Sequence, residues 1–253
     1  MILRTEPDAR QLSSPLGRLS PLTKLAIAIA WLIGLATTTA IAPPLAIAAV
    51  AMAAGMLLGR LRPTTIVRGA ALLWGAALTV GLFNAVFAAA NVDPASAELV
   101  RLGPLRLTQP GVLGGLGLTA RIIAIAAIGV VFSQTTDSTR LVDALVQQAR
   151  IPERFGYGAL AAYQAIPRLS LDLTTLRQAR RIRGLRGSWH PRLLVSLLVL
   201  AIRHADRLAL AMDARGFGSG PRSRYRAVGW TWWDGVAAVA AVGVLLGALA
   251  LPR

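Results

Sequence analysis

The 253-residue chain is 55% hydrophobic and only 15% charged, and its mean hydropathy is positive at +0.59. This composition excludes an ordinary soluble domain and predicts an all-α polytopic membrane protein of about five transmembrane helices. The net charge of +16 comes from basic residues that lie beside apolar runs, which favours the positive-inside arrangement of a membrane protein over nucleic-acid binding.

Several reactive residue types are rare or missing. The sequence has no cysteine, two histidines and a single lysine, Lys24. Cysteine chemistry is thereby excluded and a histidine-rich metal site is disfavoured. The G-x-x-x-x-G-K-[ST] loop of ATP-binding proteins cannot form, because the sole lysine, Lys24, lies at the start of the first apolar run. We therefore expect no catalytic residue, no metal site and no cofactor bound by this chain.

Four apolar runs predict an N-terminal membrane region over residues 1–134. They cover Leu22–Ile41, Leu45–Gly59, Gly69–Ala90 and Gly111–Phe132. A helix needs about 20 apolar residues to cross the hydrocarbon core, so each run is read as one span. Pro43 and Pro44 separate the first two runs and predict a tight outer turn, because proline cannot continue a helix.

Charge predicts which loops face the cytoplasm. Basic residues dominate the segment before the first span and the loop between spans two and three: Arg4, Arg10, Arg18, Lys24, Arg60, Arg62 and Arg68. The positive-inside rule places both segments, and the N-terminus, in the cytoplasm. The loop from Asn91 to Pro110 is balanced in charge and is placed outside, and the alternation from Leu105 to Thr108 indicates a short hairpin there.

Residues 135–228 form a basic region between spans four and five. From Asp137 to Arg226 there are sixteen arginines against six acidic residues, which predicts a cytoplasmic location. We expect helices over about 138–151, which Pro152 closes, over Glu153–Gln164, and from Pro167 to Arg183. A fourth runs from Pro191 to Arg215. Its predicted apolar stripe consists of Leu194, Leu197, Ala201, Ala205, Leu208 and Met212.

The last region, residues 229–253, carries the final span, Trp230–Leu251. Trp230, Trp232 and Trp233 at its start are typical of an interfacial aromatic belt, and Arg222, Arg224 and Arg226 before it of headgroup anchors. The expected topology is a multi-pass protein of the inner (plasma) membrane, with the N-terminus cytoplasmic and the C-terminus outside.

Two helices of the basic region are predicted to end in Arg-Gly, at Arg183-Gly184 and at Arg215-Gly216. One interpretation is structural: glycine after a helix end adopts the left-handed conformation, and arginine in the last turn interacts with the exposed carbonyls. Two such ends about thirty residues apart, in a basic region inserted between spans, also indicate a docking function, since arginine binds carboxylates and carbonyls at fixed geometry.

These ends resemble those of the transmembrane (T) component of energy-coupling-factor importers, a family with two coupling helices that each end in Ala-Arg-Gly. The sequence has the full signature at Ala214-Arg215-Gly216, whereas Ile182 replaces alanine before Arg183-Gly184. The resemblance implies that Arg183, Gly184, Ala214, Arg215 and Gly216 dock two cytoplasmic ABC ATPase subunits, which hydrolyse ATP with Mg. It also implies a small membrane substrate-binding (S) subunit and the uptake of a vitamin or transition metal. Further coupling or subunit contacts are expected from Arg180, Met212, Asp213 and Arg121.

Arg121 lies near the middle of span four, where an ionisable residue indicates a functional site. A backbone carbonyl, Asn84, Asp234 or another subunit remain open as its partner. Three G-x-x-x-G pairs, at Gly55, Gly111 and Gly243, predict close packing of spans or docking of a subunit. His204 is expected on a polar helix face.

Two other functions remain open at this point. One is an integral membrane enzyme acting on a phosphate-bearing lipid-linked substrate, for which the scattered acidic residues offer no paired carboxylates. The other is a self-sufficient secondary transporter, for which inverted repeats and broken helices are expected and five unequal spans provide neither.

Overall fold

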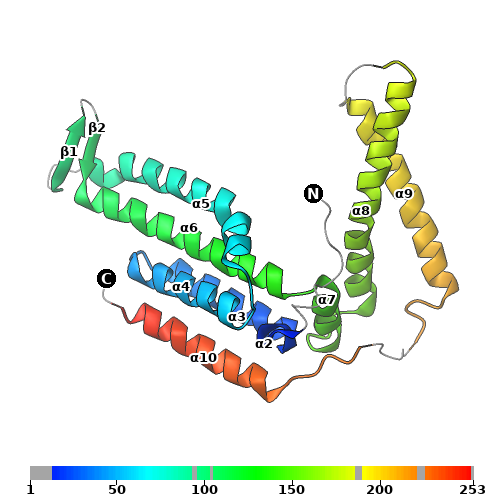
Figure 1. Cartoon of the computed structure of the whole chain (residues 1–253), viewed down its shortest axis with the longest axis horizontal. Helices are drawn as coiled ribbons and strands as arrows, with labels where there is room; N and C mark the ends of the chain where they lie inside the picture. Colours follow the sequence, from blue (N-terminus) through cyan, green and yellow to red (C-terminus); the bar gives the residue numbers. More distant parts are fainter. Residues whose placement is uncertain (1–12, 93–95, 103–104, 186–189, 221–225, 252–253) are drawn as a thin grey trace. The chain divides into compact units, whose positions relative to one another are not determined.

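The computed structural model describes residues 13–92, 96–102, 105–185, 190–220 and 226–251. Nearly all of its regular structure is helical (Figure 1). The helices are α2 (Pro15–Arg18), α3 (Pro21–Thr37), α4 (Ala42–Leu57), α5 (Pro63–Val86), α6 (Gln109–Thr135), α7 (Ser138–Gln147), α8 (Glu153–Ile182), α9 (Pro191–Ala214) and α10 (Trp232–Leu249). Between α5 and α6 lie a short 3-10 helix, η1 (Ala89–Asn91), and two strands, β1 (Glu98–Leu102) and β2 (Leu105–Thr108).

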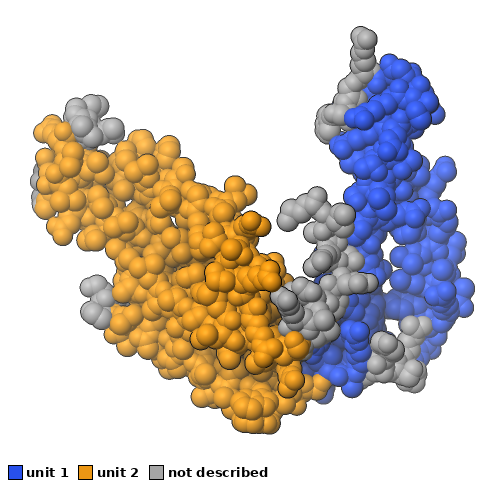
Figure 2. Space-filling view, in the orientation of Figure 1, with its two compact units in different colours: residues 1–7, 138–228 blue, residues 8–137, 229–253 orange. Residues whose placement is uncertain are grey.

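The chain divides into two compact units, coloured separately in Figure 2. One unit contains residues 138–228, with α7, α8 and α9, and the other contains residues 8–137 and 229–253, with the remaining elements. We call them the helical-hairpin unit and the membrane unit. Arg4, Arg10, Arg222 and Arg224, to which the sequence assigned roles, lie outside the described residues.

Five apolar helices of the membrane unit correspond to the five predicted spans. Within the described residues, α10, α6 and the segment Pro63–Asn91 that contains α5 have the length and composition to cross a bilayer. The other two, α3 and α4, are apolar but shorter, with 17 and 16 residues. The chain is therefore an all-α polytopic membrane protein, as predicted.

Prolines mark where four of these helices begin. α3, α4, α5 and α6 each have proline in the first two positions, where the missing N–H costs no intrahelical hydrogen bond. The predicted outer turn at Pro43-Pro44 is therefore wrong. Both prolines lie in the first turn of α4, and the chain reverses over Thr38–Ile41, where the amide of Ala40 donates to the hydroxyl of Thr38 (3.3 Å).

The core of the membrane unit is made from small residues. Trp31, Leu35 and Ile47 are buried together with alanines of α4, α6 and α10, and Trp31 Nε1 donates to the carbonyl of Ala241 at 3.0 Å. At the start of α10, Asp234 accepts from the amides of Thr231 (2.8 Å) and Ser20 (2.7 Å). Asp234 thus joins α10 to the segment before α3.

The predicted hairpin between spans three and four is confirmed. β1 and β2 pair antiparallel, with Arg101 opposite Arg106, and Arg106 forms an ion pair with Glu98. The buried Asn91 fixes the base of the hairpin, because its Oδ1 accepts from the amide (3.0 Å) and hydroxyl (2.8 Å) of Thr108 while its Nδ2 donates to the carbonyls of Ala85 and Val86.

In the helical-hairpin unit, α8 is one continuous helix of 30 residues, so the predicted start of a new helix at Pro167 is wrong. An interior proline removes one hydrogen bond and disfavours the helix by about 3 kcal/mol. The carbonyl that loses its donor is that of Tyr163, an exposed residue, where water can replace the bond. Contacts between α8 and α9 help to offset the rest.

Candidate docking site at the two Arg-Gly helix ends

The end of α8 is a Schellman motif. Arg183 is the C-cap residue of α8. Gly184 follows with a φ of +73°, in the left-handed region that glycine adopts without strain. The amide of Gly184 donates to the carbonyl of Arg181 (3.0 Å), and the amide of Leu185 donates to that of Arg180 (3.2 Å). These are the two hydrogen bonds that define the motif, and they satisfy carbonyls left over at the helix end.

The end of α9 repeats the same geometry. Arg215 occupies the cap position, and Gly216 has a φ of +71°. The amide of Gly216 donates to the carbonyl of Asp213 (2.9 Å), and the amide of Phe217 donates to that of Met212 (3.0 Å). The structural interpretation of the two glycines is thereby confirmed, and the arginine occupies the same place in each motif.

Side-chain exposure separates the candidate residues into two groups. Arg183, Gly184, Asp213, Ala214 and Arg215 are exposed, whereas Gly216 is half-buried. Arg180 and Met212 are also half-buried, and the Nε atom of Arg180 is buried without a hydrogen-bond partner among the described residues. Arg183 and Arg215 are therefore exposed at the cap positions of the two helices, with the exposed Arg181 beside Arg183.

The two helices run antiparallel, so these ends lie far apart. α8 and α9 run in opposite directions and cross each other (Figure 1). Arg154, in the first turn of α8, donates from Nη2 to the carbonyl of Gly218 (3.2 Å), just beyond the Arg215 end of α9. Arg183 lies at the other end of the 30-residue α8, which is about 45 Å long. The two Arg-Gly ends thus occupy opposite ends of the helix pair.

The apolar stripe of α9 is confirmed in part. Leu197, Ala201, Leu208 and Met212 are half-buried, but Leu194 and Ala205 are exposed, and Leu193 and Leu200 take their place on the face toward α8. His204 is half-buried in register with this stripe, so its predicted position on a polar face is wrong. These one-residue errors follow from the length of the apolar run, which offers more than one stripe at helical spacing.

A second apolar surface of α9 remains exposed. Val195, Leu198, Val199 and Ile202 are 62%, 59%, 44% and 53% exposed, and Leu194 lies beside them at 52%. Their three- and four-residue spacing places them on one face of the helix. We call these five residues the α9 outer face.

Three contacts of this unit have no local signature in the sequence. Tyr157 donates its hydroxyl proton to Asp143 (3.0 Å), joining α8 to α7. Gln147 of α7 donates to the carbonyl of Arg226 (2.8 Å) and accepts from the amide of Val228 (3.0 Å). Together with Arg154 and Gly218, these residues hold the helix pair on α7, and each contact joins elements that only the folded chain brings together.

Arg121 lies in the membrane unit, away from both Arg-Gly ends in the sequence. It donates from its guanidinium to the carbonyl of Thr38 at the end of α3, so the backbone carbonyl is the partner found among those left open. Asp234 is hydrogen-bonded near the opposite end of α3, at Ser20. Arg121 therefore donates a hydrogen bond to a carbonyl of the turn between α3 and α4. A contact between Arg121 and a subunit stays a prediction.

The described residues contain no group of three or more His, Cys, Asp or Glu side chains placed to hold a metal ion. What the two ends offer chemically is a pair of guanidinium groups on rigid helices, suited to carboxylates and backbone carbonyls of a protein partner.

The chain was compared with known proteins. The family model CbiQ, described as "Cobalt transport protein", matches residues 12–225. An energy-coupling factor transporter transmembrane protein of Heliobacterium modesticaldum is 30% identical over 93% of this chain and 92% of that protein. One from Limosilactobacillus fermentum is also 30% identical, over 53% of this chain and 57% of its own length.

Coverage differs among the relatives. The aligned part of this chain spans less than two thirds of several of them, including 58% of the Listeria innocua protein of the same description. A putative ABC transporter ATP-binding protein of Bifidobacterium longum is 31% identical over 147 residues, which make up 19% of that protein.

Proposed function

Because the chain belongs to the CbiQ family of cobalt transport proteins, we propose that it transmits ATP-driven movement within an energy-coupling-factor importer. The family membership assigns the chain to transporter membrane components and not to enzymes. In the proposed assembly two cytoplasmic ABC ATPase subunits hydrolyse ATP with Mg, and a small membrane S subunit binds a vitamin or transition metal.

The observation that carries this proposal is the matched pair of Arg-Gly ends. Two caps with the same hydrogen bonds, each with an exposed arginine at the cap position, lie at opposite ends of a helix pair about 45 Å long. One small binding site on one partner cannot contact both. Two copies of the same ATPase can contact both caps, with one copy at each cap and the same kind of groove in each copy. The repeated cap therefore matches a repeated partner.

Rigid helices suit the transmission of movement. The caps satisfy the helix-end carbonyls, and Arg154 and Tyr157 join α8 to its neighbours. A force applied at Arg183 or Arg215 would therefore move the helix pair as a body and not merely rotate a side chain. The similarity to part of an ABC ATP-binding protein supports an ATPase as the partner.

The α9 outer face supports an apolar partner such as the S subunit. Five neighbouring apolar side chains left exposed on one helix are typical of a protein or membrane interaction site. We propose that this face contacts the S subunit at the cytoplasmic surface of the membrane, while the helix ends contact the ATPases.

The proposed topology follows from charge. The regions 1–134, 135–228 and 229–253 keep their proposed roles as membrane region, cytoplasmic coupling region and final span, in the cell's plasma membrane. The N-terminus is then cytoplasmic and the C-terminus outside.

Copurification tests the docking function. The chain is coexpressed with its ATPase subunits, and Arg183→Ala, Arg215→Ala and the double variant are compared for the number of ATPases retained. Because each arginine occupies the cap position at its helix end, we expect each single change to weaken one ATPase contact by about 2 kcal/mol, or about 30-fold in Kd. The double variant should retain neither ATPase.

Arg203→Ala is the matched control, since Arg203 is exposed in the middle of α9, away from both ends. It should copurify like the unaltered chain. Retention of both ATPases by the double variant, in a protein that elutes as a folded monodisperse species, would refute the docking function.

A further inference from the structure

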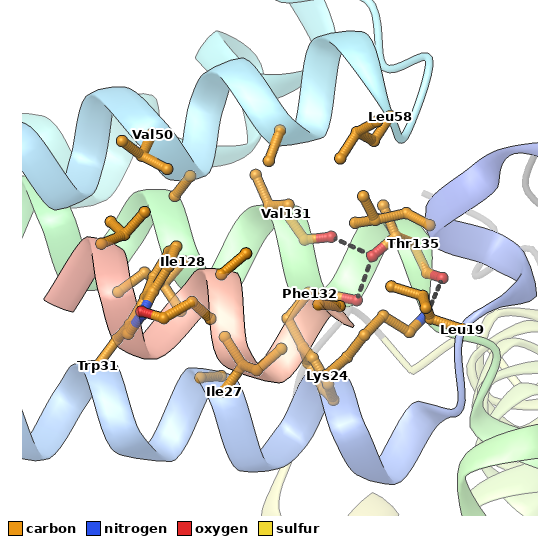
Figure 3. Close-up of a pocket in the computed structure, with 18 residues that line it drawn as sticks. Leu19, Lys24, Ile27, Trp31, Val50, Leu58, Ile128, Val131, Phe132 and Thr135 are labelled. Carbon is orange, nitrogen blue, oxygen red and sulfur yellow. Dashed lines mark hydrogen bonds between the residues drawn. The ribbon is translucent and has the colours of Figure 1, made fainter. Parts of the chain in front are cut away.

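A cavity of about 270 Å³ lies within the membrane unit, between α3, α4, α6 and α10 (Figure 3). Its wall is almost entirely apolar and includes Ile27, Trp31, Ile128 and Val131. Much of the rest is alanine, such as Ala28 and Ala54, which leaves the space that larger side chains would fill. Protein interiors are normally packed without voids of this size, so an apolar occupant is expected.

The cavity opens toward the surface along α4. Two of its lining residues, Val50 and Leu58, are 37% and 48% exposed, while the lining residues Trp31 and Val131 are buried. An exposed apolar opening on a helix of the membrane unit faces hydrocarbon in a bilayer. A lipid chain can therefore enter from the side without crossing a polar barrier.

One end of the cavity is polar and basic. Lys24, which lines it, donates from Nζ to the carbonyl of Thr135 (2.6 Å). The amide of Leu16 in α2 donates to the carbonyl of Leu58 at the end of α4 (3.3 Å), and both residues line the cavity. Arg18 lies two residues after Leu16, and Arg60 lies two residues after Leu58. Both arginines are exposed. They form what we call the basic rim.

The basic rim has few acidic residues to neutralise it. The sequence contains no Asp or Glu between Asp8 and Asp93, a stretch that supplies α2, α3, α4 and the connection to α5. Asp234, in the first turn of α10, is already hydrogen-bonded to the amides of Ser20 and Thr231. An apolar slot with two exposed arginines two residues beyond its lining residues Leu16 and Leu58 matches one chemistry, an acyl chain attached to a negatively charged headgroup.

We propose that this cavity binds one acyl chain of an anionic phospholipid from the leaflet on the basic side, with the lipid phosphate at Arg18 and Arg60. The lipid fills the gap between α3 and α4 and thereby completes the packing of the membrane unit. The site is independent of the two Arg-Gly ends, which belong to the other unit.

Photolabelling in vesicles tests this site. The full chain with its partner subunits is reconstituted in equal amounts of phosphatidylglycerol and phosphatidylcholine, with a photoreactive group on the acyl chain of one or the other lipid. We expect the phosphatidylglycerol probe to label the lining segments of α3, α4 or α10, as read by peptide mass spectrometry. Ala54→Phe fills the slot and should abolish this labelling.

Matched variants separate the apolar slot from the charged rim. Ala53→Phe alters the neighbouring exposed residue of α4, which does not line the cavity, and should label like the unaltered chain. Arg18→Gln and Arg60→Gln should each reduce the preference for phosphatidylglycerol over phosphatidylcholine by about fivefold. Arg68→Gln, which changes an exposed arginine of α5 outside the cavity, should leave the preference unchanged.

The proposal fails if Ala54→Phe labels as strongly as the unaltered chain, or if both lipids label the site equally. It also fails if the probe labels the isolated chain but not the complex, because a partner helix would then be the occupant. Ala240→Leu fills the slot from α10 and serves as the second variant if Ala54→Phe does not fold.

Discussion

At the scale of the residue, the two Arg-Gly pairs combine two separable properties. The glycines have positive φ values and complete the Schellman hydrogen bonds, so they shape the helix ends. The residue before each arginine differs: Ile182 precedes one and Ala214 the other. The departure from Ala-Arg-Gly at Ile182 leaves the cap geometry unchanged, and Ile182 itself is 87% exposed.

A substitution at Gly184 tests the backbone requirement. Gly184→Ala forces an alanine into the left-handed region and should destabilise the end of α8 by about 1 kcal/mol. Gly158→Ala is the control, because Gly158 lies inside α8 with no atom near its would-be Cβ, and it should stabilise the helix by about 1 kcal/mol. Thermal unfolding followed by circular dichroism measures the unfolding midpoint of both variants. Midpoint shifts of the same sign would contradict the left-handed conformation assigned to Gly184.

At the scale of the element, the turn between α3 and α4 shows how a short connection is held against a long helix. The carbonyl of Thr38 accepts from Arg121, and the carbonyl of Thr39 lies 2.7 Å from the position that a Cβ on Gly117 would occupy. Arg121 and Gly117 are one helical turn apart in α6. The turn packs on α6 because glycine gives it room and arginine satisfies its carbonyl, which matters where water is scarce.

Replacing Arg121 should loosen this turn. Arg121→Leu leaves the carbonyl of Thr38 without its donor, at a cost of about 1–3 kcal/mol. Since the native sequence has no cysteine, Thr39→Cys gives a reporter without background, and its reaction with a thiol reagent should be faster in the Arg121→Leu chain. Equal rates with arginine and leucine at this position would show that Arg121 does not hold the turn.

At the scale of the whole molecule, the glycine pairs determine how closely the membrane helices approach. Gly81 of α5 and Gly115 of α6 face each other, and a Cβ on either would lie 2.5–2.8 Å from the other's carbonyl oxygen. Gly55 packs against Val131, so it too serves internal packing. Gly243 and Gly247 of α10 have no atom within 4 Å of the same position among the described residues, and internal packing does not explain them.

Gly115→Leu should therefore disrupt the α5–α6 pair. The new side chain meets backbone and Ala85, which cannot move without separating the helices, and overpacking of this kind costs about 1–3 kcal/mol. Gly129→Leu lies on the same helix at an open position and should be tolerated. The comparison is made by thermal unfolding in detergent, and equal unfolding midpoints for the two variants would refute the close approach.

The sequence by itself determined the features that depend on local chemistry. Runs of apolar residues predicted the five helices of the membrane unit, because a helix in lipid must satisfy its backbone internally and expose apolar side chains. The alternation near Leu105 predicted the hairpin, and glycine after arginine predicted both helix caps. Each of these signals lies within a few residues of the structure it specifies.

Tertiary structure alone decided the features that depend on distant partners. Pro167 is tolerated inside α8, where the carbonyl that loses its donor belongs to the exposed Tyr163 and α9 contacts the helix. Pro43 and Pro44 start α4 because the turn forms earlier, over Thr38–Ile41. The antiparallel pairing of α8 and α9 set the distance between Arg183 and Arg215. The hydrogen bond from Arg121 to Thr38 joins residues 83 positions apart. The residues around either position do not indicate this contact, because it depends on how α3 and α6 pack.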